Sequence, residues 1–185
     1  MRFYSPLRYP GGKSKLTKQI ISLFETNNYN NGVYIEPFAG GAGIALSLLL
    51  NNYVDRIHIN DLDISIYSFW KAILEDSEKF IQLIWKTPIT IDEWKFQKNI
   101  QENPESASTL ELGFSTFYLN RTNISGIIKG GVIGGYSQNG NYKMDARFNK
   151  EKLVDRIQKI VLFKDRINVT NLCVMDLIKN TLNTT

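Results

Sequence analysis

The chain has 185 residues, enough for one domain with a substantial buried core and room for an inserted lobe. Its 43% hydrophobic and 22% charged residues are typical of a soluble globular protein, and the longest apolar run, near residues 44–50, is too short to span a bilayer. The net charge of +4 suits a polyanionic partner without requiring one.

Single cysteine and histidine residues narrow the possible chemistry. Cys173 alone excludes an internal disulfide and a cysteine-cluster zinc site, and it fits a reducing compartment. His58 alone excludes a histidine-rich metal site, and its place in the strand-like segment RIHIN favours packing over catalysis. The N-terminal MRFYSPLRYPGGKSK lacks the apolar core of a signal peptide. We therefore expect a cytoplasmic protein without a metal or a membrane segment.

The first third of the chain alternates strands and helices. After a loop rich in proline and glycine, apolar spacing predicts a helix over residues 14–24. GVYIEPF predicts a buried strand that ends at Glu36 and Pro37, and IALSLLLNN predicts a helix after a glycine turn. RIHIND predicts a second strand ending at Asp61. This order is the first half of a doubly wound α/β sheet.

The pattern changes after Asp63. Residues 64–119 are predicted to be mainly helical, and the glycine-rich SGIIKGGVIGGYSQNGNYK predicts a hairpin at Asn139 and Gly140. NKEKLVDRIQKIVLF predicts an amphipathic helix, and RINVTNLCVMDLI predicts a third strand running into Asp176. We expect a cofactor-binding region over residues 1–63, an inserted target-recognition lobe over residues 64–145, and a return to the first domain over residues 146–185.

The glycine turn after Pro37 matches neither common nucleotide motif. A dinucleotide fingerprint needs glycine where Leu46 stands, and a P-loop needs glycine where Leu7 stands before GGKS. Exposed backbone amides at a helix N-terminus can bind a ligand carboxylate with an adjacent ammonium, or a phosphate. The alternative is that the glycines only permit a tight strand-to-helix turn. Asp61 lies where an acid would hold a ribose, or it caps a helix. Together these features indicate a nucleoside-bearing ligand, and S-adenosylmethionine has both a ribose and an amino-acid end.

Four segments, RYPGGKSKL, IEPFAGGAGIAL, INDLD and FYLNRTNISGIIKGG, occur in this order. Together they resemble the Dam-type family of adenine-specific DNA methyltransferases, which transfer a methyl group from S-adenosylmethionine to adenine N6. The similarity covers essentially the whole chain. It implies a Rossmann-like S-adenosylmethionine-dependent methyltransferase sheet with an inserted, mainly helical DNA-recognition lobe.

The resemblance also implies two sets of site residues. Lys13 would pair with the cofactor carboxylate, Asp61 would hold the ribose, and Asp176 would contact the cofactor's adenine amine or else cap a helix. The implied cofactor residues are Tyr9, Lys13, Pro37, Phe38, Gly40, Gly43, Asp61 and Asp176. The implied partner is double-stranded DNA, with contacts from Asn120, Arg121, Lys129, Tyr142, Lys143 and Arg147. Tyr136 or Tyr142 would wedge into the duplex; the alternative for each residue is hairpin surface.

One element of the family pattern is absent. The catalytic motif Asp/Asn/Ser-Pro-Pro-aromatic accepts hydrogen bonds from the adenine amine, and the chain contains no Pro-Pro pair. We therefore expect little or no methyl transfer by these residues alone. The alternatives are a truncated chain, a split enzyme completed by a second polypeptide, a non-catalytic remnant that binds DNA or cofactor, and the same fold with cytosine N4, RNA or a small molecule as acceptor.

Overall fold

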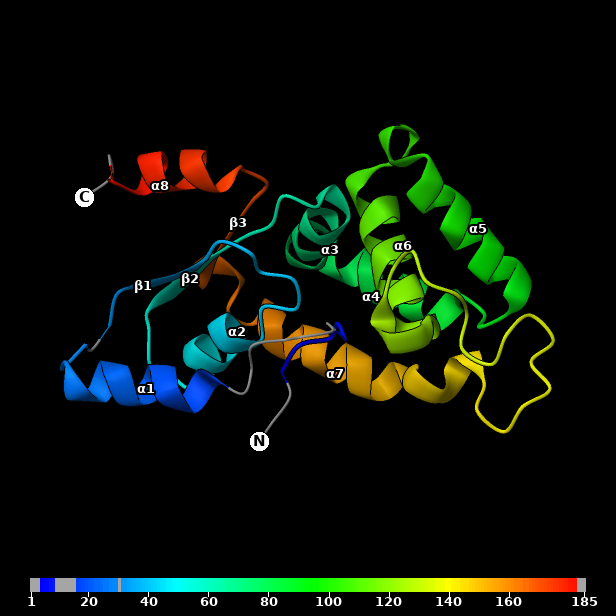
Figure 1. Cartoon of the computed structure of the whole chain (residues 1–185), viewed down its shortest axis with the longest axis horizontal. Helices are drawn as coiled ribbons and strands as arrows, with labels where there is room; N and C mark the ends of the chain where they lie inside the picture. The colour runs from blue at the N-terminus through cyan, green and yellow to red at the C-terminus, as the bar shows by residue number, and fades with distance from the viewer. Residues whose placement is uncertain (1–3, 9–15, 30, 183–185) are drawn as a thin grey trace.

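A computed structural model describes residues 4–8, 16–29 and 31–182 of the chain (Figure 1). Its sheet has three parallel strands in the order β1-β2-β3. The strands are β1 (Val33–Glu36), β2 (Arg56–Asn60) and β3 (Ile167–Thr170). The first two match the strands expected from GVYIEPF and RIHIND. Their order is that of one half of a doubly wound sheet, so the α/β class is confirmed.

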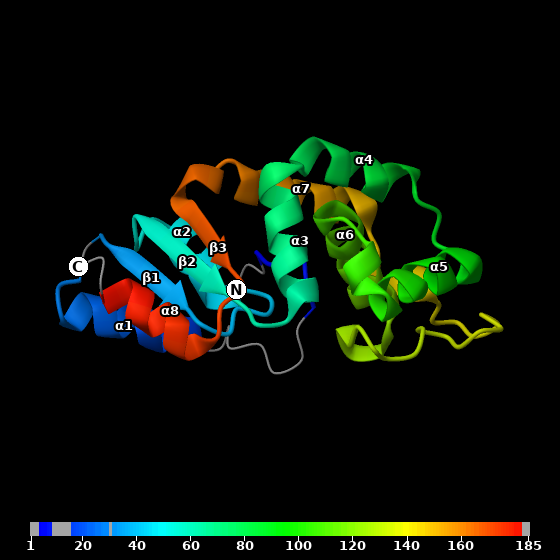
Figure 2. The same cartoon turned by 90° about the horizontal axis from the view of Figure 1, so that it is seen from above.

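Helices lie on both faces of this sheet. Figures 1 and 2 show α1 (Thr17–Thr26) and α2 (Gly43–Leu50) on one face and α8 (Val174–Leu182) on the other. Helix α2 packs against β1, β2 and α1, and it is apolar around most of its circumference. A helix of this kind has to be buried on several sides, which explains its central place.

The chain between β2 and β3 is mainly helical. It forms α3 (Ile64–Glu75), α4 (Ser77–Lys86), α5 (Ile91–Glu102), α6 (Thr109–Thr122) and α7 (Lys150–Val161). Helix α6 lies between α3 and α5, with every residue from Leu112 to Thr122 buried. A side chain at Gly113 would meet the Ser68 carbonyl at 2.5 Å, so glycine permits the close approach of α6 to α3. Stacked rings of Phe69 and Phe117, 6.2 Å apart, extend this core.

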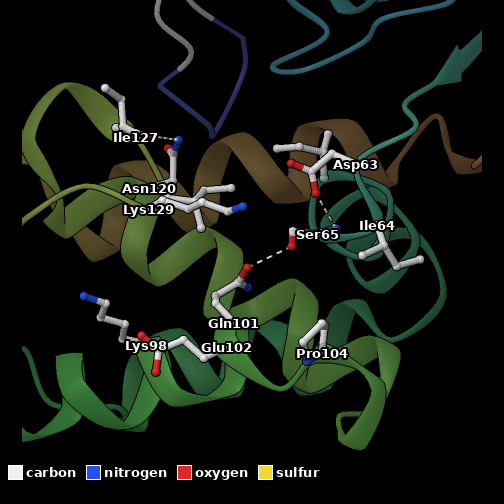
Figure 3. Close-up of a pocket in the computed structure, with 13 residues that line it drawn as sticks. Asp63, Ile64, Ser65, Lys98, Gln101, Glu102, Pro104, Asn120, Ile127 and Lys129 are labelled. Carbon is white, nitrogen blue, oxygen red and sulfur yellow. Dashed lines mark hydrogen bonds between the residues drawn. The ribbon is translucent and has the colours of Figure 1, made fainter.

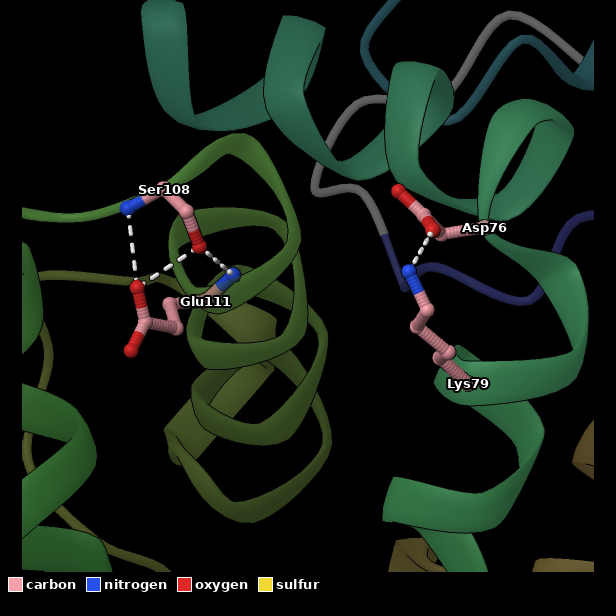
Figure 4. Close-up of polar contacts among 4 residues, drawn as sticks. All are labelled: Asp76, Lys79, Ser108 and Glu111. Atoms are coloured by element: carbon pink, nitrogen blue, oxygen red, sulfur yellow. Dashed lines mark hydrogen bonds and ion pairs between the residues drawn. The ribbon is translucent and has the colours of Figure 1, made fainter.

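A side-chain capping box defines where α6 begins, and an ion pair lies at the start of α4 (Figure 4). The Ser108 hydroxyl accepts from the Glu111 N–H at 3.2 Å, and the Glu111 carboxylate accepts from the Ser108 N–H at 2.9 Å, which is a capping box at the start of α6. At the start of α4, Lys79 and Asp76 form an exposed ion pair at 2.8 Å. Such a pair contributes little to stability because solvent screens it.

The predicted hairpin is wrong. In the described chain from Asn123 to Met144 the ladder contact is a single bridge between Asn123 and Val132, and the rest forms turns and 3-10 helices. Positive φ angles at Ser125, Gly126 and Gln138 interrupt any extended pairing. Side-chain amides bond this backbone in place of a second strand: Asn123 Nδ2 donates to the carbonyls of Ile127 and Ile128, both at 2.9 Å.

The predicted third strand is too long. Strand β3 ends at Thr170, and Asp176 lies in the first turn of α8 instead of at a strand end. The reason is local, because the Leu177 N–H bonds back to the Cys173 carbonyl and so begins a helix. No helix in the described ranges has both the length and the apolar character needed to span a bilayer.

Candidate functional site

The turn between β1 and α2 packs a bare main chain against the carboxyl end of the sheet. Ala39, Gly40, Gly41 and Ala42 are all buried. Gly40 and Ala42 both have φ +46°, a left-handed conformation that is open to glycine and costs alanine roughly 1 kcal/mol. Ligands of open α/β sheets bind at this edge, outside the carboxyl ends of the strands.

Two of the predicted cofactor residues meet at this edge. The Gly40 N–H donates to Asp61 Oδ2 at 2.8 Å, and the Asp63 N–H donates to Asp61 Oδ1 at 3.0 Å. These bonds fix the orientation of the carboxylate. Because a carboxylate offers about four acceptor positions, it retains capacity for two ligand hydroxyls.

Glu36, which the sequence analysis did not single out, adds a second acid beside the turn. It is 5% exposed, and its Oε2 accepts from the Ala45 N–H at 3.2 Å in the first turn of α2. The helix dipole stabilises a negative charge at this position. A carboxylate therefore lies at the N-terminus of α2, next to the glycine turn. The available signal was an acid at the end of an otherwise apolar strand.

A buried amide, also missed, connects the ends of the three strands. Asn60 Nδ2 donates to the carbonyls of Pro37 and Leu172, both at 3.0 Å. Its Oδ1 accepts from Thr170 Oγ1 at 2.8 Å and from the Leu172 N–H at 2.9 Å. Asn60 is 1% exposed, so all four bonds form away from water. This side chain therefore sets the spacing between the glycine turn and the segment that follows β3.

Two further contacts hold the same edge. Trp70 on α3 donates its indole N–H to the Gly40 carbonyl at 2.9 Å. His58 Nε2 lies 2.8 Å from Thr170 Oγ1, and because the single hydroxyl proton of Thr170 goes to Asn60, His58 Nε2 must be the donor. Burial lowers the pKa of His58 below its ordinary value. The geometry of His58 is that of a packed strand residue.

The other predicted cofactor residues are less closely grouped. Phe38 is 61% exposed at the turn, next to Pro37, and Gly43 is the first residue of α2. Asp176 is exposed, and its Oδ2 accepts at 2.9 Å from Sγ of Cys173, which lies immediately before α8. Tyr9 and Lys13 lie outside the described residues.

Two of the predicted DNA-contacting residues are buried. Asn120 is 1% and Arg121 6% exposed, and both side chains bond to the N-terminal segment. Asn120 accepts from the Arg8 N–H at 2.7 Å and donates to the Arg8 carbonyl at 2.6 Å. Arg121 donates through Nε to the Pro6 carbonyl at 2.7 Å, and its Nη2 donates to the same oxygen. Their polar groups are thus used inside the chain.

The remaining DNA candidates are exposed, as a surface role requires. They are Lys129, Tyr142, Lys143 and Arg147. The Arg147 guanidinium lies 5.3 Å from the Tyr142 ring centroid, a cation–π arrangement. Tyr136, the other suggested wedge, is 64% exposed and its ring packs edge-on against Trp94.

A pocket of about 1090 Å³ separates the start of α3 from α5 and from residues 126–129 (Figure 3). Lys98 and Lys129 lie on one side of it, and Asp63 lies on the other. Between them Gln101 accepts from the Ser65 hydroxyl at 2.8 Å. The described residues contain no group of three His, Cys, Asp or Glu side chains that could hold a metal.

A bare turn and an oriented acid that follows the neighbouring strand thus lie together at the carboxyl edge of a parallel sheet, the edge at which open α/β proteins bind their ligands. The sequence matches the D12 class N6 adenine-specific DNA methyltransferase family over residues 9–183, and the chain belongs to this family. The resemblance inferred from the four segments is therefore confirmed.

Two curated relatives are modification enzymes. The chain is 29% identical over 98 residues to "Modification methylase StsI" of Streptococcus sanguinis, covering 53% of this chain and 14% of that protein. It is 22% identical over 160 residues to "Type II methyltransferase M.MjaIII" of Methanocaldococcus jannaschii, covering 80% of this chain and 55% of that protein. The chain thus spans about half or less of the length of these relatives.

Proposed function

We propose that the chain provides the cofactor-binding and DNA-binding regions of an adenine-N6 DNA methyltransferase that uses S-adenosylmethionine. The observation that carries the proposal is the pairing of Asp61 with Gly40 beside the buried carboxylate of Glu36. The first pair offers acceptors to a ribose diol, and the negative charge of the second acid favours an ammonium group near the turn. A nucleoside that also carries an amino-acid end satisfies both.

The residues of this edge would bind and orient the methyl donor. Asp61 would accept from the ribose hydroxyls, and the turn from Pro37 to Gly43 would enclose the methionine end, with Glu36 near its ammonium. Lys13 and Tyr9 would complete the site from the N-terminal side. The cofactor supplies an electrophilic methyl group, and the task of these residues is to hold it in one orientation for in-line attack.

The helical chain between β2 and β3, with the segment over residues 123–145, forms the proposed DNA-recognition lobe. Exposed cations and an exposed aromatic ring lie on or next to that segment: Lys129, Tyr142, Lys143 and Arg147. Such groups bind the phosphate backbone, and affinity of this origin falls steeply with salt. The pocket beside Lys98 and Lys129 adds apolar contact area from Ile127 to this surface.

Methyl transfer needs a group that accepts hydrogen bonds from the adenine amine, and the sequence holds no Pro-Pro pair that would mark it. We therefore propose that such a group comes from residues other than these 185, in a longer chain or a second polypeptide. A non-catalytic protein that binds cofactor and DNA is the second candidate, favoured by the same absence.

Calorimetric titration with S-adenosylhomocysteine tests the cofactor site. Asp61→Ala removes the proposed ribose acceptors and should weaken binding by about 1–3 kcal/mol. Asp55→Ala is the matched control, because Asp55 also accepts from a glycine N–H, that of Gly32 at 2.9 Å, but it lies before β2 at the amino end of the strands. Equal affinity in the Asp61 variant and the native chain would remove Asp61 from the site.

A further inference from the structure

The N-terminal segment of residues 4–8 is anchored by contacts along its whole length. Figure 1 shows it in dark blue beside α7. The Tyr4 hydroxyl donates to Asn51 Oδ1 at 3.2 Å, and Arg156 on α7 donates to the Ser5 carbonyl at 3.1 Å. Leu7 is buried in the hydrophobic core. The segment therefore has one fixed path between α2, α6 and α7.

Helix α6 makes the strongest of these contacts. Asn120 bonds both the N–H and the carbonyl of Arg8, as a neighbouring strand would, and also donates to the Gly126 carbonyl at 2.8 Å. A side chain at Gly126, which has φ +76°, would meet the Arg8 carbonyl at 2.6 Å. Glycine at this position therefore permits the close approach of Arg8 to the loop after α6.

Arg121 provides this anchoring at an energetic cost. Within the described residues the ion pairs join lysines to acids three or four positions away, and none includes Arg121. Burial, followed by the charges of Arg156, Arg8 and Arg147, lowers the pKa of Arg121 to about 9, which leaves its guanidinium charged at neutral pH. A buried charge without a counter-charge is unfavourable, so stability does not explain an arginine here.

We propose that Asn120 and Arg121 are positioning residues that fix the backbone of Pro6 to Arg8, from which the proposed cofactor ligands Tyr9 and Lys13 continue. This inference rests on the proposed cofactor site. Because α6 belongs to the proposed DNA-recognition lobe, the same contacts link that lobe to cofactor affinity, and such linkage is reciprocal between two ligands.

The test is Arg121→Met in the whole chain, measured by thermal unfolding and by titration with S-adenosylhomocysteine. Methionine keeps most of the side-chain volume and removes the charge and both donors. The variant removes a buried charge that has no counter-charge, and this gain opposes the cost of leaving the Pro6 carbonyl without its donors, so the melting temperature should change little. The dissociation constant should rise about tenfold. A role in stability alone would leave the dissociation constant unchanged.

The matched control is Lys150→Met. Lys150 on α7 also donates to two backbone carbonyls, those of Trp85 at 2.9 Å and Thr87 at 2.8 Å, far along the chain from residues 4–8. It should bind S-adenosylhomocysteine as the native chain does. Equal weakening in both variants would overturn the inference, as would native affinity in Arg121→Met.

A conservative variant decides the case in which Arg121→Met does not fold. Arg121→Lys keeps the charge but lacks the two-donor fork, so it should fold and bind with intermediate affinity. Native affinity in this variant would overturn the inference. Failure of the native chain to bind S-adenosylhomocysteine would instead overturn the proposed cofactor site.

Discussion

Replacing Asn60 with alanine should be among the most destabilising single changes in this protein. The substitution removes four hydrogen bonds and leaves the carbonyls of Pro37 and Leu172, the Thr170 hydroxyl and the Leu172 N–H to find other partners. A buried polar group left unpaired costs about 1–3 kcal/mol, and water entering the new space recovers some of it. We therefore expect a loss of about 3–5 kcal/mol in the free energy of unfolding.

Urea denaturation followed by circular dichroism measures this loss, because the free energy of unfolding falls linearly with denaturant. Asn103→Ala is the matched control, since the Asn103 amide donates to the Asn99 carbonyl at 2.9 Å but is exposed. It should change the free energy of unfolding by less than about 1 kcal/mol. A loss below about 1 kcal/mol in Asn60→Ala would contradict the view that this amide determines the spacing of the strand ends.

Two further predictions concern stability and pH. Burial lowers the pKa of His58, so the native state disfavours the charged imidazole. The free energy of unfolding should therefore decrease as pH falls below 6.5, the ordinary pKa of histidine. Urea denaturation of a His58→Gln variant should show no such decrease. Ser108→Ala should lower the free energy of unfolding by about 1 kcal/mol through loss of the capping box. Ser108 lowers the pKa of Glu111, so the difference in stability between the native chain and Ser108→Ala should become smaller as pH falls below 4.5. Thermal melts of both proteins measure this difference. A difference that stays constant with pH would show that the bond to the Glu111 carboxylate is not its cause.

The strands and the glycine turn could be predicted because their signals are local. A short apolar run ending in a polar residue or an acid marks β1 and β2, and the small residues after Pro37 favour a tight turn. Asp61 follows from the same reasoning, because the carboxyl ends of neighbouring parallel strands meet at one edge. The periodic spacing of apolar residues likewise marks α7, whose buried residues recur on one face.

Burial of polar side chains could not be predicted in this way. Asn120 and Arg121 are of the types that contact DNA, and nothing in FYLNRTN shows that they face residues more than a hundred positions earlier. The prediction of a hairpin was wrong for a related reason. Asn139 and Gly140 are a strong turn signal, but a hairpin needs two extended strands, and the positive φ angles at Gly134 and Gly135 prevent one of them.

Four side-chain amides share one physical role that accounts for both wrong predictions. A carboxamide presents donors and acceptors in one plane, so it bonds a peptide group as a neighbouring strand would. Asn60, Asn120, Asn123 and Gln138 each bond main-chain groups where the chain is neither helix nor strand. In such segments a polar side chain can satisfy the main chain in place of a helix or a strand, so its presence alone does not indicate a ligand-binding role. The irregular loops at the carboxyl edge of the sheet and after α6 are therefore held in place by side-chain bonds, as the proposed site would require in order to orient a methyl donor.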